Sequence, residues 1–133
     1  MEITYKKHIN TEKDNRVEFL LINYDYIDGN DYLARLFFEE YGFIIEDKID
    51  GWWYSIIRIH LKRSTYELLW HEDIGNEIYS LNQTKKENEM LQQRLEGVLP
   101  VLNNRINEKK GAVNGNMDNS ASLNQQGGCN CDS

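Results

Sequence analysis

The densest group of ionisable side chains in this sequence is His71-Glu72-Asp73. An imidazole beside a carboxylate is a common arrangement for general acid–base catalysis. These residues come where a predicted strand runs into a turn, and adjacent strand residues point to opposite faces of a sheet. The pattern therefore favours a solvated turn. We predict no catalytic residues and no enzymatic activity, and a small hydrolase that uses His71 is the least favoured hypothesis.

Metal-binding patterns are equally weak. The three histidines fall on three separate predicted strands, at His8, His60 and His71. The acidic segment 25–31 resembles a calcium-binding loop centred on Gly29. That template would place Tyr24 at its first ligand position and Arg35 at its closing glutamate, so it fails. We predict neither a metal nor a cofactor.

The two cysteines, Cys129 and Cys131, lie near the end of the sequence. A disulfide across a single residue is strained. The following Asp132-Ser133 leaves neither cysteine at the spacing of a prenylation motif. We interpret them as incidental or regulatory thiols, reduced in a cytoplasmic setting.

Tryptophan and tyrosine give the clearest indication of a binding surface. Core packing accounts for most of these side chains. Trp52 and Trp53 are adjacent, however, and only one of two adjacent strand residues can face a single core. If the helices cover one face of the sheet, Trp52 and Tyr54 form an apolar patch ringed by acids on the other, as in an interface hot spot. The predicted partner-binding residues are Trp52, Tyr54, Trp70, Glu72 and Asp73.

A sheet must position these residues. Segment 50–70 holds all three tryptophans. An Asp-Gly pair opens it, and two β-rich runs, 52–61 and 64–71, follow, which is typical of antiparallel strands joined by turns. We expect this segment at the centre of the sheet.

Four other segments have strand patterns. Residues 2–9 alternate between apolar and polar and predict an edge strand, whereas 17–24 are apolar on both faces and predict an interior strand. Residues 43–49 alternate again. Residues 77–81 predict a short last strand.

Two helices are predicted. Apolar residues at steps of three and four predict a short helix from Asp31, with Asn30 as its N-cap and Gly42 as its end. Thr84 and Glu87 have the spacing of a capping box at the start of a longer helix. Its apolar stripe consists of Leu91, Leu95, Val98, Leu102 and Ile106.

This second helix is expected to reach about Glu108 and to kink or divide at Pro100. Its apolar spacing lasts about two heptads, so we favour packing on the sheet over a coiled coil. The predicted fold is α+β, a mostly antiparallel sheet of five to six strands in the order β-β-α-β-β-β-(β)-α, covered by both helices. Residues 1–110 form one domain. Residues 111–133 have almost nothing to bury and are predicted to be a disordered tail.

Charge restricts the partners. The chain of 133 residues has 15 basic and 22 acidic side chains, a net charge of −7. Such a surface repels nucleic-acid phosphates and anionic lipids, so we expect neither nucleic acid nor membrane as a partner. Charges at the N-terminus stand where a secretory signal needs an apolar run, which leads us to expect a cytoplasmic location.

These features are similar to those of one family. An acidic α+β protein with an Asp-Gly-Trp hairpin at 50–52 and a Trp-His-Glu-Asp-Ile-Gly-Asn turn at 70–76 resembles the small immunity proteins that neutralise bacterial polymorphic toxins. The likeness covers roughly residues 17–106 and rests on size, acidity and overall pattern. It implies tight binding of a cognate toxin domain, commonly a basic nuclease, without chemistry of its own.

Our leading hypothesis is therefore a non-enzymatic protein-binding module, whose acidic face steers a basic partner and whose exposed aromatic side chains fix it. The second is a self-associating domain that forms a homodimer through its aromatic face or its terminal helix.

Overall fold

The computed structural model describes residues 2–115, with side chains placed as far as residue 107. The chain divides into two units, Met1–Pro100 and Val101–Ser133. The whole sheet, the first helix and the first half of the second helix belong to the first unit.

The predicted α+β class is confirmed, with six strands and two α-helices in the described part of the chain. The elements in order are β1 (Thr4–Asn10), the 3₁₀ helix η1 (Thr11–Lys13), β2 (Arg16–Ile22), α1 (Gly29–Tyr41), β3 (Ile44–Asp50), β4 (Tyr54–Leu61), β5 (Ser64–His71), β6 (Gly75–Ser80) and α2 (Lys85–Gly115).

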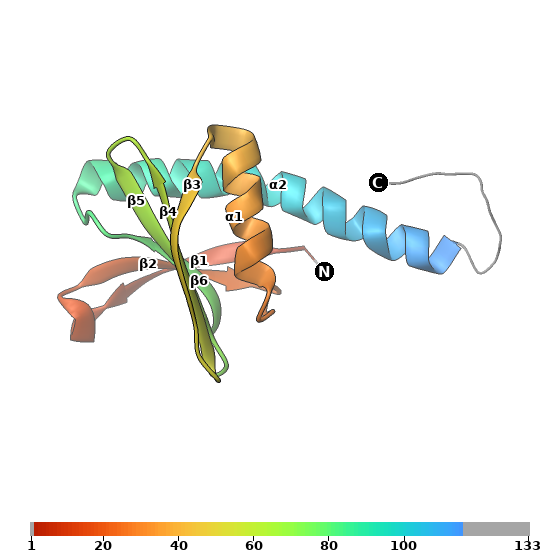
Figure 1. Cartoon of the computed structure of the whole chain (residues 1–133), viewed down its shortest axis with the longest axis horizontal. Coiled ribbons are helices and arrows are strands. Elements are labelled where there is room, and N and C mark those ends of the chain that lie inside the picture. Colours follow the sequence, from red (N-terminus) through yellow and green to blue (C-terminus); the bar gives the residue numbers. More distant parts are fainter. Residues whose placement is uncertain (1, 116–133) are drawn as a thin grey trace. The chain divides into compact units, whose positions relative to one another are not determined.

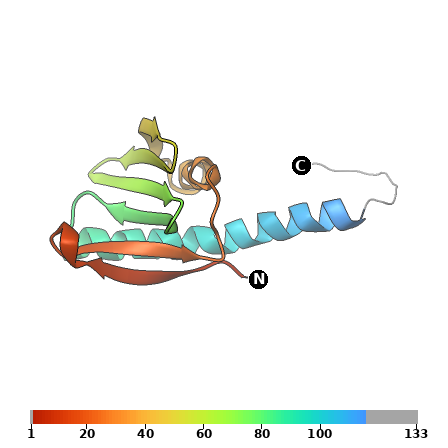
Figure 2. The same ribbon diagram turned by 90° about the horizontal axis from the view of Figure 1, so that it is seen from below.

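All neighbouring strands are antiparallel, in the spatial order β1-β2-β6-β5-β4-β3. Figure 2 shows them side by side, from β1 in red to β3 in olive. As predicted, β1 is an edge strand and β2 lies inside the sheet. Segment 50–70 was predicted at the centre of the sheet, and only its second strand, β5, is there. Strand β6 lies between β2 and β5, so β4 is next to the edge strand β3. Alternation assigns faces to a strand but not neighbours, so the sequence could not place β6.

Helix α1 and the first half of α2 pack on one face of the sheet, which we call the helix face (Figure 1). Directly opposed residues share a face, and the row Phe19, Ile78, Leu68 and Ile57 is fully buried under the helices. The predicted stripe on α2 is buried there too, at Leu91, Leu95 and Val98. No helix of the first unit covers the opposite side of the sheet, the open face.

The ends of α1 confirm one prediction and correct another. Gly42 follows the last turn in a left-handed conformation (φ 90°), and its N–H donates to the carbonyl oxygen of Phe38 at 2.9 Å. The predicted N-cap is wrong. The helix starts earlier, with Asp28 at the cap position and without a side-chain cap bond. Asn30 is instead fully buried in the first turn.

The predicted capping box of α2 is half formed. The Thr84 hydroxyl accepts a bond from the Glu87 backbone N–H at 3.2 Å. The Glu87 carboxylate turns to the sheet instead, where it accepts a bond from the Ser64 hydroxyl at 2.9 Å. Arg94 donates to that same hydroxyl and to the Tyr66 hydroxyl, at 3.1 and 2.7 Å. The buried polar groups thus join α2 to β5.

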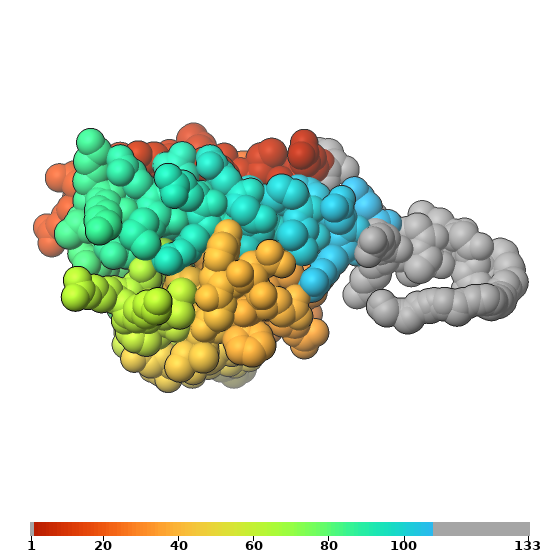
Figure 3. Space-filling view, turned by 90° about the horizontal axis from the view of Figure 1, so that it is seen from above, coloured from red at the N-terminus to blue at the C-terminus, as the bar shows by residue number. Residues whose placement is uncertain are grey.

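The first half of α2 also lies against α1, as the teal and orange surfaces of Figure 3 show. The Tyr41 hydroxyl donates to the Arg94 carbonyl oxygen at 2.8 Å. Gly97 allows this approach, because a Cβ there would lie 2.3 Å from the Tyr41 hydroxyl oxygen.

Helix α2 continues through Pro100 and is not divided there, although the boundary between the two units falls at this residue. It runs to Gly115, so the predicted start of the tail, residue 111, falls within it. The remainder of the predicted tail, including Cys129 and Cys131, lies outside the described residues.

Candidate binding surface

Three connections meet at one end of the sheet: the loop 23–28 before α1, the turn 51–53 and the turn 72–74. The two turns lie together at the lower end of the strands in Figure 1. A bond from the Glu72 backbone N–H to the Trp53 carbonyl oxygen, at 3.0 Å, joins them. The Asp25 side chain from the loop lies beside Gly75, at the end of the second turn. We call the residues of these three connections, with Asp50, the end surface.

Both tryptophans of the turn 51–53 are exposed, Trp52 at 94% and Trp53 at 55%. The expectation that one of them belongs to the core is therefore wrong. The predicted strand 52–61 starts only at Tyr54, so the strand alternation that required one buried side chain does not apply to these two residues. Tyr26, Ile27 and Ile74 are exposed on the neighbouring connections.

The other two predicted aromatic residues are half-buried. The indole N–H of Trp70 donates to the Asp25 carboxylate at 2.8 Å, which fixes the loop 23–28 to the end of β5. The Tyr54 ring lies over Gly51, where a Cβ would come within 2.2 Å of the ring. We conclude that these two side chains shape the end surface, while Trp52 and Trp53 project from it.

The charge of the end surface has one sign. Its acidic residues are Asp25, Asp28, Asp50, Glu72 and Asp73, and its segments contain neither lysine nor arginine. Two of these carboxylates are engaged, Asp25 with Trp70 and Asp50 with the Ser55 hydroxyl at 3.0 Å. Glu72 and Asp73 are exposed. The two predicted acids thus stand beside exposed indoles.

His71 is tied to the backbone of its own turn. Its Nδ1 accepts a bond from the Asp73 N–H at 3.1 Å. The orienting partner of the imidazole is thus a backbone amide and not the carboxylate of Glu72 or Asp73. Among the described residues, no group of three histidine, cysteine or acidic side chains is placed to hold a metal ion.

Two buried asparagines hold the end surface in place. The side-chain oxygen of Asn76 accepts a hydrogen bond from the Tyr26 backbone N–H at 2.8 Å. Its side-chain nitrogen donates to the Tyr26 carbonyl oxygen at 3.2 Å and to the Asn30 side-chain oxygen at 3.0 Å. Asn30 in turn donates to the backbone oxygens of Ser55 and Leu68, at 3.3 and 3.1 Å. Sequence patterns did not reveal this network, because each asparagine occurs beside a turn, where exposed asparagine is common.

None of the described helices is long and apolar enough to cross a membrane. Comparisons of the chain with protein-family models, curated proteins and solved structures find no match.

Proposed function

We propose that this chain is a non-enzymatic protein-binding module and that the end surface binds a basic protein. The observation that carries the proposal is the pair of adjacent exposed tryptophans on a hydrogen-bonded turn, in a surface that has five acidic residues and no lysine or arginine. Trp is among the residues most often found at interface hot spots. Exposed clusters of large apolar side chains commonly mark interaction sites.

The chemistry of the surface indicates the partner. Carboxylates attract a basic protein and speed its encounter with the surface. An arginine or lysine of the partner can then lie over an indole face, where a cation–π contact contributes about 1–2 kcal/mol once water is excluded. Together with the resemblance to immunity proteins, this favours a cognate basic toxin domain as the partner and a cytoplasmic site of action.

Homodimerisation through the same surface is less favoured. A second copy would bring its own five carboxylates against those of the first, without a basic side chain from either end surface to offset them. Juxtaposed like charges oppose association. A partner of opposite charge meets no such penalty.

The test is affinity capture with the full chain from the cells that produce it, followed by binding measurements on the captured protein. The tested variant is Trp52→Ala/Trp53→Ala. The control is Phe38→Ala, because Phe38 is also an exposed aromatic residue (58%) but lies on α1. We expect the double variant to weaken binding by about thirtyfold or more and the control to bind as the unchanged chain does.

Co-expression tests the finer proposal. If a toxic basic domain is encoded beside this chain, the unchanged chain should restore growth of cells that express the toxin, and the double tryptophan variant should not. Restoration by both proteins would show that the end surface is not the inhibitory site.

A further inference from the structure

The open face carries a buried carboxyl group at the centre of the sheet. Glu77 lies on β6 and is only 3% exposed. The residues directly opposite it are both apolar, Leu20 on β2 and Leu69 on β5. Within the described residues, its side chain makes no hydrogen bond. Burial disfavours the charged carboxylate much more than it disfavours the neutral carboxylic acid.

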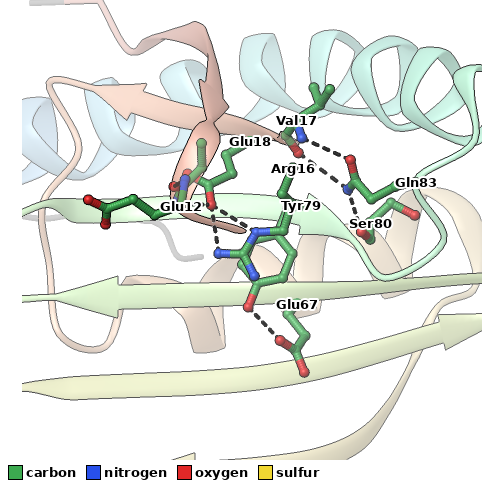
Figure 4. Close-up of polar contacts among 9 residues, drawn as sticks. Glu12, Arg16, Val17, Glu18, Glu67, Tyr79, Ser80 and Gln83 are labelled. Atoms are coloured by element: carbon green, nitrogen blue, oxygen red, sulfur yellow. Dashed lines mark hydrogen bonds and ion pairs between the residues drawn. The ribbon is translucent and has the colours of Figure 1, made fainter. Parts of the chain in front are cut away.

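The charged neighbours of Glu77 relieve only part of the cost of its ionisation. Arg16 is within 2.6 Å of the Glu18 carboxylate and stacks over the Tyr79 ring at 3.7 Å (Figure 4). Arg58 is bound to Glu67 at 2.8 Å, and the Tyr79 hydroxyl donates to that same carboxylate. Both arginines of this face therefore already have an acidic partner.

Other groups on this face add negative charge or lie at its margin. Glu18 is diagonal to Glu77 on β2, and Glu67 is diagonal to it on β5. His71 lies on the same face of β5, and Lys6 lies beyond Leu20 on the edge strand β1. Burial and the nearby Glu18 raise the pKa of Glu77 from 4.5 to about 7, and Arg16 lowers it only in part. The carboxyl is thus poised to change charge near neutral pH.

Glu77 also occupies the shortest strand junction of the sheet. The register of β2 and β6 pairs only Glu18 with Tyr79, Phe19 with Ile78 and Leu20 with Glu77. Every other junction pairs a longer run of residues. This junction joins the β1–β2 hairpin to the four strands β3–β6. The buried carboxyl group of Glu77 is therefore located at the junction with the fewest paired residues.

We propose that Glu77 is a proton-binding site that controls how firmly the β1–β2 hairpin is joined to the rest of the sheet. With its proton, the side chain packs as a neutral group between Leu20 and Leu69. Without it, the carboxylate gains hydration when β2 separates from β6, so deprotonation favours opening of this junction. The inference is independent of the end surface.

Hydrogen exchange of the backbone amides between pH 5 and 8, corrected for the intrinsic effect of pH, tests the proposal. The closed junction holds the proton more tightly than the open one, so raising the pH favours opening until the pH exceeds the pKa of the closed form. Protection of residues 18–20 and 77–79 should fall by up to about tenfold per pH unit below pH 7 and level off above it. Protection across β4 and β5 should change much less.

Two variants remove the proton site. Glu77→Gln is close in shape, and Glu77→Leu completes the apolar row, so both should abolish the pH dependence at residues 18–20. Glu46→Gln, an exposed glutamate of β3, is the matched control and should retain it. Because histidines also change charge near neutral pH, His71→Asn is a second control that should retain it.

Three results would overturn the proposal. The first is an unchanged pH dependence in Glu77→Gln or Glu77→Leu. The second is an equal loss of protection in β4 and β5, which would show that the whole sheet responds. The third is a failure of both variants to fold at any pH, which would show that the site requires a carboxyl group.

Discussion

Individual residues in the end surface and in the strands behind it have separate roles. Trp70 uses its indole N–H to hold Asp25, and Asn76 uses both ends of its amide to hold the backbone of Tyr26. Trp52 projects into solvent. Trp70 and Asn76 therefore hold the loop 23–28 in one conformation in the free protein. A surface that is already ordered loses less conformational entropy on binding, which raises affinity.

Replacing Asn76 should loosen the loop that carries Tyr26. Asn76→Ala removes both bonds to the Tyr26 backbone and leaves Asn30 with a buried unpaired oxygen, so we expect a loss of about 2–3 kcal/mol in the free energy of unfolding. Chemical denaturation measures it. Gln93→Ala, which also removes an amide but from an exposed side chain of α2, should change stability by less than about 0.5 kcal/mol. Equal effects of the two changes would show that the buried network contributes no stability.

Glu77 should make global stability depend on pH. Its pKa is raised from 4.5 to about 7 in the folded chain, so the unfolded chain loses this proton first as the pH rises. The contribution of Glu77 to the free energy of unfolding therefore falls between about pH 4.5 and 7 and is constant above pH 7. Glu77→Gln should therefore gain up to about 3 kcal/mol relative to the unchanged chain on going from pH 5 to pH 8. A constant difference between the two proteins over this range would contradict the assignment.

At the scale of elements, the sequence correctly predicted the features that depend on residues only a few positions apart. Glycine at the end of α1, threonine at the start of α2 and the apolar stripe of α2 all act within a few residues, and their predicted roles are confirmed. Long-range pairing was not predictable in the same way. The place of β6 at the centre, and hence the burial of Glu77, depends on which strands meet, and alternation does not encode that choice.

In the end surface, too, features set by the local sequence were predicted, and features set by long-range contacts were not. Sequence patterns placed Trp52 in an apolar patch ringed by acids, but they also led us to expect one of the two adjacent tryptophans in the core, because they continued the strand through residues that form a turn. They predicted Trp70 as a partner-binding residue but did not predict that it is half-buried and bonded to Asp25. That bond links residues 45 positions apart, and no local pattern indicates it.

The contact between α1 and α2 gives a prediction for a single glycine. Gly97→Ala should destabilise the protein by about 1 kcal/mol or more, because the added Cβ would lie 2.3 Å from the Tyr41 hydroxyl oxygen. In a Tyr41→Phe background the hydroxyl is gone, and alanine's better helix propensity, about 1 kcal/mol, should then prevail. Urea denaturation of the four proteins measures this. The same penalty in both backgrounds would mean that the close approach is not its cause.

For the whole molecule, the distribution of charge is as informative as its sum. The net charge is −7, and the end surface alone contributes five carboxylates without a lysine or arginine. The cationic residues of β1, Lys6 and Lys7, belong to the edge strand at the far side of the sheet. If the proposed basic partner is correct, this charge should guide it toward the exposed tryptophans, and we predict that its rate of association falls as salt is added.

The most direct measurement is the dissociation constant of the captured partner for three proteins: the unchanged chain, Trp52→Ala/Trp53→Ala and Phe38→Ala. The proposed function predicts a partner with an excess of lysine and arginine, binding weakened by about thirtyfold or more in the double variant, and a change within about twofold in the control. Binding of equal strength by the double variant and the unchanged chain, or an acidic partner, would contradict it.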